Sequence, residues 1–237
     1  RRKAELVAPS DSDSVRIYHC PFQQLQDAAD LTPESVQCVL TDIPYGNDFV
    51  DQLGELARFA SEVLVEGGVF VCYVGQHRLN EKMRAFDEHL KYQWMGTSRW
   101  VGPGNPMHTV KVVSNSIPFV VYTKGERDRD QWTKWLDTLE FDMKEKEYHP
   151  WQRPLAEIEK LIRYFTRPGD LVVDPCGGGF TTAVAAQRLG RQCVSCDIEK
   201  AHVVTGQQRL KEEDALPIEL DEPSLVDAEI LSVEMAA

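Results

Sequence analysis

The sequence predicts a single α/β domain with a Rossmann-like, doubly wound and mostly parallel sheet that carries helices on both faces. Short apolar runs rich in β-branched residues alternate with segments of helical periodicity along most of the chain. One of these runs is followed by the glycine loop 177–179, which opens a helix, as expected where a parallel sheet binds a ligand. The length of 237 residues favours one sizeable core.

The apolar runs and the periodic segments give the expected order of elements. Strands are predicted at residues 15–18, 36–40, 69–74, 93–100, 117–123, 171–173 and 192–196. Helices are predicted at residues 22–29, 51–65, 79–90, 154–165, 181–189 and 201–210. Gly67 and Gly68 are expected to end the second helix, because glycine is a common helix terminator.

The segments between these elements are predicted to be irregular. Residues 102–106, with the sequence Gly-Pro-Gly-Asn-Pro, are too rich in Gly and Pro for regular structure and predict a loop. Residues 125–148 are charged and resemble a small insertion into the domain. We therefore expect a catalytic domain at 15–211, between a flexible N-terminal segment at 1–14 and a flexible acidic tail at 212–237.

The net charge of −12 first argues against an anionic partner, but the charge is unevenly distributed. Residues 212–237 contain nine carboxylates and no Lys or Arg, so the remaining 211 residues carry a net charge of only −3. A nearly neutral body can still present a basic groove to nucleic acid. The residues available to line it are Arg78, Lys82, Arg84, Arg99, Lys111, Arg153 and Arg163, although each could equally be a solvated surface charge.

Several classes of protein are disfavoured by composition. There is no apolar run of eighteen residues and no signal-peptide pattern, so we expect a cytoplasmic protein without a membrane span. The six cysteines mostly lie inside apolar strand-like segments, which favours reduced, buried thiols over a disulfide scaffold. Cys193 and Cys196 have the C-x-x-C spacing but no second pair, and we interpret them as packed side chains. No metal site is predicted.

The tetrapeptide Asp42-Ile43-Pro44-Tyr45 ends an apolar run and is followed by Gly46. An exocyclic amine on adenine or cytosine is a poor nucleophile, because its lone pair is delocalised into the ring. The Asp42 carboxylate and the carbonyl of Ile43 or Pro44 would each accept one N–H and free that lone pair, while Tyr45 would stack on the base. A proline-bent strand exit with a packed tyrosine is the alternative interpretation.

A second motif, residues 174–181, follows the strand predicted at 171–173. Its glycines allow close approach of a ligand to the backbone, and Asp197 at the end of the next strand suits a ribose diol. A dinucleotide site usually has spaced glycines directly after the strand, whereas here Asp174 and Pro175 intervene and the glycines are contiguous. This favours a nucleoside with a cationic amino-acid tail, such as S-adenosylmethionine, whose ammonium or sulfonium end could face Asp174.

Together with His149-Pro150-Trp151-Gln152-Arg153-Pro154, the two motifs resemble the S-adenosylmethionine-dependent amino-methyltransferases that modify DNA. Their order, with the catalytic loop before the glycine loop, is similar to the permuted beta group of that family, and the resemblance covers roughly residues 15 to 210. It implies catalytic roles for Asp42, Pro44 and Tyr45. It also implies cofactor contacts from His19, Cys20, Asp42, His149, Gln152, Pro154, Asp174, Cys176, Gly177, Gly178, Gly179, Phe180, Thr181, Asp197 and Ile198.

The substrate implied by the resemblance is double-stranded DNA with a flipped-out base. Tyr45, Gly46, Lys111, Trp132 and Trp135 are the candidate substrate contacts; the two tryptophans could stack on nucleic acid or form the apolar stripe of a short helix. The expected reaction is methylation of adenine N6, as in restriction–modification enzymes, with cytosine N4 or RNA adenine as alternatives. The target-recognition insert implied by the resemblance is small and confined to about residues 125–148, so a homodimer or an additional specificity domain could contribute to sequence recognition.

Three departures from the family pattern affect this expectation. Ile43 stands where DNA enzymes of the group usually have proline, Cys20 replaces a carboxylate, and the glycine loop is Cys-Gly-Gly-Gly-Phe rather than Phe-x-Gly-Ser-Gly. A nucleic-acid-binding pseudoenzyme of the same fold and a nicotinamide-dependent oxidoreductase are the competing hypotheses. Binding of S-adenosylmethionine would discriminate between them.

Overall fold

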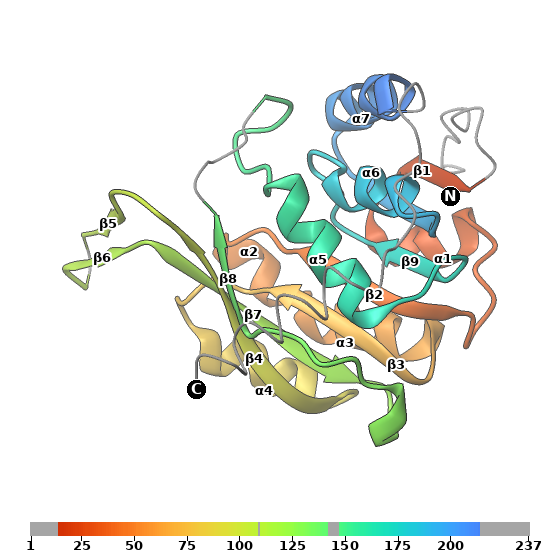
Figure 1. Cartoon of the computed structure of the whole chain (residues 1–237), viewed down its shortest axis with the longest axis horizontal. Coiled ribbons are helices and arrows are strands. Elements are labelled where there is room, and N and C mark those ends of the chain that lie inside the picture. Colours follow the sequence, from red (N-terminus) through yellow and green to blue (C-terminus); the bar gives the residue numbers. More distant parts are fainter. Residues whose placement is uncertain (1–13, 109, 142–146, 214–237) are drawn as a thin grey trace.

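The computed structural model describes residues 14–108, 110–141 and 147–213 (Figure 1). Its centre is an eight-stranded sheet with the order β1-β10-β9-β2-β3-β7-β4-β8. The strands are β1 (Val15–His19), β2 (Val36–Asp42), β3 (Leu64–Tyr73), β4 (Lys91–Trp100), β7 (Ser116–Thr123), β8 (Thr138–Phe141), β9 (Leu171–Asp174) and β10 (Gln192–Asp197). The first five in this order are parallel, β7 is antiparallel to both β3 and β4, and β8 is parallel to β4. The predicted mostly parallel sheet is confirmed.

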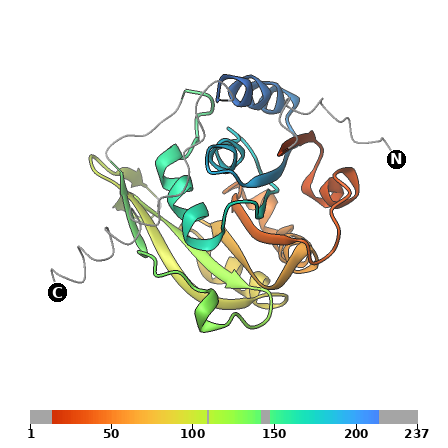
Figure 2. The same ribbon diagram turned by 45° about the vertical axis from the view of Figure 1, so that its right-hand side comes forward.

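Helices cover both faces of this sheet (Figure 2). One core cluster packs α1 (Leu25–Ala28), α3 (Leu53–Val63) and α4 (Leu79–Asp87) on one face, and a second packs α5 (Leu155–Phe165), α6 (Thr181–Arg188) and α7 (Lys200–Glu213) on the other. Two short 3-10 turns, η1 (Phe22–Gln24) and η2 (Arg129–Gln131), and the one-turn α2 (Asn47–Val50) complete the described helices. The doubly wound fold class is therefore confirmed.

The helix predicted at 51–65 ends earlier than expected. It stops at Val63, and Leu64 is already extended and opens β3, so Gly67 and Gly68 lie inside a strand. The Gly67 amide donates to Lys124 O, and the Lys124 amide donates to Gly68 O. These hydrogen bonds to Lys124, which directly follows β7, place the glycines in the sheet. The local sequence around the glycines does not encode such long-range pairing.

The loop predicted at 102–106 is partly a strand. Asn105–Met107 (β5) pairs antiparallel with Val112–Ser114 (β6), and the two form a hairpin that projects away from the body of the domain (Figure 1). Pro106 is tolerated because a two-stranded ribbon leaves one side of each strand without a partner. The predicted insertion at 125–148 contains η2 and β8, and β8 extends the main sheet beside β4.

Both predicted flexible ends lie largely outside the described residues, and so do residues 142–146 of the insertion. Helix α7 continues through Glu213, which corrects the expected start of the tail at 212. All six cysteines are described and free, and all except Cys176 are buried, as predicted. In the described ranges we find no helix with the length and apolar character needed to cross a membrane.

Candidate active site

Three aspartates gather at one edge of the sheet. Asp42 ends β2, Asp174 ends β9 and Asp197 ends β10. These strands are parallel neighbours, so their carboxyl ends meet at the same edge, which is where ligands bind in this class of fold. A cavity of about 550 Å³ lies between them and is lined by all three aspartates, the glycine loop and the residues that follow β2.

Two of the three loop glycines, Gly177 and Gly179, have little room for a side chain. A Cβ atom on Gly177 would lie 2.6 Å from the Phe180 ring and 2.7 Å from Ser195 Oγ, and a Cβ on Gly179 would lie 3.1 Å from His149 Cβ. Gly178 has a φ of +49°, a left-handed conformation that glycine adopts without strain. The sequence therefore uses glycine here because the backbone itself forms the wall of the cavity.

Asp174 is buried beneath this loop. Its Oδ1 accepts hydrogen bonds from Thr41 Oγ1 at 2.9 Å and from the Cys176 amide at 3.1 Å. Burial raises the pKa of Asp174 from 3.8 to about 6, because ionisation is costly away from water. A cationic ligand in the cavity would offset that cost.

Asp197 holds the other side of the loop. Its Oδ2 accepts from the Gly178 amide at 2.9 Å, and its Oδ1 accepts from the Glu199 amide at 2.7 Å and lies 3.2 Å from His202 Nδ1. The His202 ring packs edge-to-face against His149, with centroids 4.7 Å apart. Burial, assisted by His202, lowers the pKa of His149 and so favours its neutral form.

The segment after β2 is fixed by Arg153, which follows Asp42 by 111 residues in the chain. Arg153 Nε donates to Asp42 Oδ2 at 2.7 Å, and the Tyr45 hydroxyl donates to Asp42 Oδ1 at 2.6 Å. Arg153 Nη2 also donates to the Tyr45 hydroxyl oxygen at 2.6 Å. Gly75, with φ +60°, lies against the Tyr45 ring, where an added Cβ would be 3.4 Å from a ring carbon. One side of the tyrosine is thus backed by main chain.

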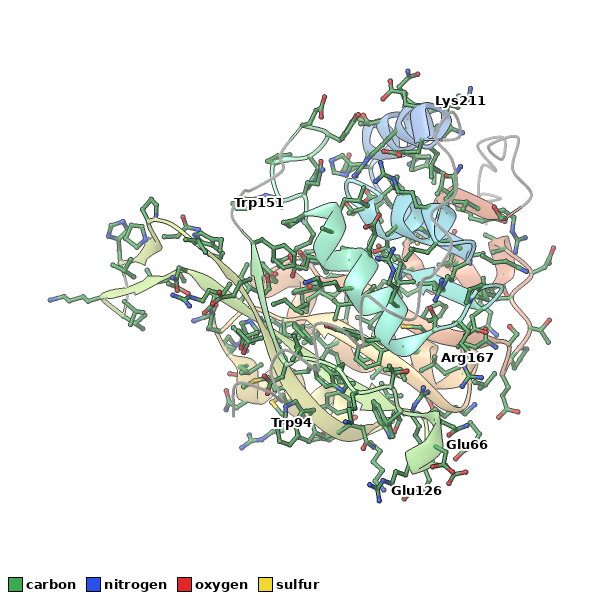
Figure 3. All side chains as sticks on the ribbon, in the orientation of Figure 1. Glu66, Trp94, Glu126, Trp151, Arg167 and Lys211 are labelled. Atoms are coloured by element: carbon green, nitrogen blue, oxygen red, sulfur yellow. The ribbon has the colours of Figure 1, made fainter. Side chains whose placement is uncertain are left out.

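A second cavity of about 580 Å³ shares part of this wall. The residues that line both cavities are Asp42, Tyr45, Trp151, Gln152 and Arg153. The second cavity continues along Ser98, Arg99 and Trp100 to the β5–β6 hairpin, from which Asn105, Met107 and Ser114 contribute. Trp151 lies near the amino-terminal end of α5 and Trp94 lies far from it in the same view (Figure 3).

Buried polar groups support the wall between the cavities. The Tyr73 hydroxyl donates to Glu157 Oε1 on α5, and the Arg153 guanidinium lies 4.1 Å from the centroid of the Tyr73 ring. Burial raises the pKa of Glu157. Lys82 donates from Nζ to the Val74 carbonyl, and burial lowers the pKa of Lys82.

Most of the predicted site residues line the first cavity. They are Asp42, Pro44, Tyr45, Gly46, His149, Gln152, Asp174, Cys176, Gly177, Gly178, Gly179, Thr181, Asp197 and Ile198. Pro154 lines only the second cavity. The structure thus brings together segments that are more than a hundred residues apart in the sequence.

Three predicted cofactor contacts lie elsewhere. Phe180 is fully buried and packs against Gly206 of α7, where a Cβ would lie 2.3 Å from its ring, so it supports the loop from behind. Cys20 is buried among core residues, and His19 Nε2 lies 3.1 Å from the Ile198 carbonyl oxygen. Neither His19 nor Cys20 lines the cavity.

The predicted nucleic-acid contacts Trp132 and Trp135 are also placed away from both cavities. Trp135 packs on Phe165, with ring centroids 5.4 Å apart, and Trp132 packs on the same ring at 6.3 Å. Both tryptophans are partly buried against the core, and the segment that carries them has no regular secondary structure, in contrast to the short helix of the apolar-stripe alternative. Lys111 lies on the β5–β6 hairpin with a φ of +52°, outside the lining of either cavity.

The sequence does not identify several of the residues that line the first cavity. Arg153 was treated only as a possible groove cation, although it belongs to the same six-residue motif as His149 and Gln152. Thr41, adjacent to Asp42, could have been found from its position at a strand end. His202 and Tyr73 carry no sequence signal, because only the fold brings them to the site.

A family model described as DNA methylase, N6_N4_Mtase, matches residues 36–208. The chain belongs to the N6/N4 DNA methylase family. The match covers both strand-end motifs and the segment that carries Arg153, so the resemblance inferred from the sequence is confirmed. Among relatives of this chain, the type II methyltransferase M2.DpnII of Streptococcus pneumoniae is 36% identical over 89 residues, 38% of this chain and 32% of that protein.

The DNA adenine methyltransferase YhdJ of Escherichia coli (strain K12) is 38% identical over 68 residues, 29% of this chain and 23% of that protein. The chain thus spans about a third or less of the length of these two relatives. Among solved structures, the M1.HpyAVI–SAM complex is similar with a TM-score of 0.68 and 23% identity, covering 83% of this chain and 99% of that one. At that identity the likeness concerns the fold.

Proposed function

We propose that this methylase transfers a methyl group from S-adenosylmethionine to the exocyclic amine of a flipped-out DNA base, with adenine N6 as the target. The observation that carries the proposal is the position of Asp42 and Tyr45 in a wall shared by two cavities. One cavity has the features of a cofactor site and the other continues toward an exposed hairpin. Methyl transfer requires such an arrangement, since donor and acceptor must meet at one point.

The first cavity fits the cofactor chemically. Its lining contains the carboxylates of Asp42, Asp174, Asp197 and Glu199, which suit a ligand with a cationic amino-acid end and a ribose diol. The glycine backbone accommodates close approach, and the volume of about 550 Å³ is in the range of small-molecule sites. When bound, S-adenosylmethionine supplies an electrophilic methyl group on sulfur.

The residues of the chain prepare the acceptor. Asp42 accepts one N–H of the base amine and the carbonyl of Ile43 or Pro44 accepts the other, which leaves the nitrogen lone pair free for in-line attack. Tyr45 stacks on the base. Asp42 would accept the proton that the base nitrogen loses on methylation and would pass it to water.

The charge distribution supports a DNA partner on the hairpin side. Residues 89–125, which include β4, the hairpin and β7, contain no Asp or Glu in a chain with 38 acidic residues. Of its cations, Arg99 and Lys111 lie toward the hairpin, and Arg99 pairs with Glu140. Lys91 and Lys124 lie at the opposite ends of β4 and β7, where they pair with Glu126 and Glu34. We assign DNA contact to the hairpin in place of Trp132 and Trp135, and we propose that a second copy or a separate specificity domain helps to choose the target sequence.

The experiment that tests the function combines isotope-labelled cofactor with genomic DNA and with total RNA. Nucleoside mass analysis should find N6-methyladenine in the DNA. N4-methylcytosine would change the assigned base, and a methylated RNA with unmodified DNA would overturn the substrate. Calorimetry addresses the pseudoenzyme hypothesis, since a chain that does not bind S-adenosylmethionine cannot follow the proposed reaction.

A further inference from the structure

Arg153 lies where the two cavities meet, and its guanidinium contacts both functional side chains of the segment after β2. Nε donates to Asp42 Oδ2 at 2.7 Å and Nη2 donates to the Tyr45 hydroxyl oxygen at 2.6 Å. Because the Tyr45 hydroxyl donates to Asp42 Oδ1, the three side chains close a ring of hydrogen bonds. We call this the Arg153 ring.

The Arg153 ring fixes the orientation of the Asp42 carboxylate. Its two oxygens have different partners, so the carboxylate cannot rotate without breaking a hydrogen bond. Each carboxylate oxygen can accept two hydrogen bonds, so each keeps acceptor capacity for an amine N–H. The ion pair is shielded, since the side chains of Arg153 and Asp42 are 12% and 24% exposed, and shielding strengthens the attraction.

Arg153 is itself held from the opposite side. Its guanidinium lies 4.1 Å from the centroid of the Tyr73 ring, and the Tyr73 hydroxyl is bonded to Glu157 on α5. The segment that ends at Arg153 also presents His149 and Gln152 to the first cavity. The arginine therefore links the cofactor side of the site to a catalytic loop that lies 111 positions earlier in the chain.

We propose that Arg153 is a positioning residue for methyl transfer, which sets the Asp42 carboxylate and the Tyr45 ring before the base arrives. This inference rests on the proposed function and adds a role for a residue outside the catalytic loop. A purely structural arginine would affect stability and ligand affinity. A positioning arginine changes turnover, because a small displacement of a group that contacts the reacting atoms slows the reaction strongly.

The test compares Arg153→Met, which removes the charge and the donors, with Arg153→Lys, which keeps the charge but not the planar fork. We expect kcat to fall about 100-fold in Arg153→Met and about tenfold in Arg153→Lys. The affinity for S-adenosylmethionine, measured by calorimetry, and the KM for DNA should stay within about threefold. With 2-aminopurine at the target position, Arg153→Met should give a less quenched fluorescence, because Tyr45 is no longer fixed.

Arg163→Met is the matched control. Arg163 is a half-buried arginine of α5 that pairs with Glu159 and lines neither cavity. Its loss should leave kcat within about twofold of the wild type. Tyr45→Phe serves as a second variant if Arg153→Met does not fold, since it opens the Arg153 ring but keeps the aromatic face; we expect kcat to fall about tenfold with flipping retained.

Different results would contradict the proposed function and the positioning role of Arg153. If the wild type transfers no methyl group to DNA, the proposed function and the positioning role both fail. If the wild type is active and Arg153→Met turns over like Arg163→Met, only the positioning role is overturned. The same conclusion follows if Arg153→Met loses cofactor affinity and thermal stability in proportion to kcat, because that pattern marks a structural residue.

Discussion

The two cavities that meet at Asp42 and Tyr45 are built by different halves of the sheet. The first is made by the parallel half of the sheet and contains four carboxylates and one guanidinium in its lining. The second reaches into the antiparallel half, and its lining contains two carboxylates, Asp42 and Glu157, with three cations, Lys82, Arg99 and Arg153. Under the proposed function, the carboxylate-rich first cavity would hold the cation-ended nucleoside, and the DNA would approach through the second cavity from the hairpin side.

The largest effect is expected from the loss of Asp42, one of the five residues that line both cavities. Asp42→Ala should lower methyl transfer about 1000-fold, because the amine loses the acceptor that frees its lone pair. Binding of S-adenosylmethionine should be largely retained, as measured by calorimetry, since Asp174 and Asp197 remain. Near-normal turnover in this variant would show that the catalytic loop is wrongly assigned.

The second prediction concerns the acidic cavity alone. Burial raises the pKa of Asp174 above its unfolded value, to about 6, so the ionised carboxylate destabilises the ligand-free fold. The destabilisation is absent below pH 3.8, grows as the pH rises toward 6, and is complete above that. Asp174→Asn should therefore raise the free energy of unfolding by about 2 to 3 kcal/mol at pH 8 and by little at pH 4.

Urea denaturation at the two pH values measures this effect. The same variant should bind S-adenosylmethionine about 30-fold more weakly at pH 8, because the cation loses its buried counter-charge. A variant that is less stable at pH 8 and binds the cofactor normally would contradict the assignment of Asp174 to the cationic end.

The third prediction concerns the hairpin side. Met107, Val112 and Val113 are 44%, 51% and 70% exposed, and apolar side chains on an arm beside a base pocket can wedge into a duplex. Replacing all three with Ser should lower kcat/KM on duplex DNA about tenfold, with little change on single-stranded DNA, where no base pair must open. Steady-state kinetics on both substrates measures the difference.

Trp94→Ser with Met95→Ser is the control for the hairpin, since both side chains are exposed and line neither of the two cavities that meet at Asp42. Equal loss on duplex and single-stranded DNA would count against the wedge. A change of oligomeric state in the hairpin variant, seen by size-exclusion chromatography, would instead identify the arm as a contact between copies of the chain.

The smallest effect is expected for Lys111→Ala. Loss of one phosphate contact should weaken DNA binding about threefold and reduce the slope of log affinity against log salt by about one. Fluorescence anisotropy across a salt series measures both quantities. An unchanged slope would show that Lys111 does not contact a DNA phosphate.

The parallel half was predictable from sequence because its signals are local. Strand 36–40, the Asp42 motif and the glycine loop each follow from residues that adjoin in the chain, and the parallel order brings them to one edge. In the antiparallel half, the strands at 93–100 and 117–123 follow from their sequences in the same way. The Gly- and Pro-rich composition of 102–106 hides β5, and β8 is fixed only by its pairing with β4. The role of Arg153 could not be predicted from the sequence, because its partner Asp42 lies 111 residues earlier in the chain.

The contact between Phe180 and Gly206 also defines how far the chain can be shortened. Phe180 occupies the space that a side chain at 206 would fill, and Arg209 donates to the Gly179 carbonyl at 2.7 Å and to Thr181 Oγ1 at 3.0 Å. The glycine loop is therefore braced by a helix that follows it by about thirty residues. Any minimal version of the domain for crystallography or engineering must extend at least through residue 209.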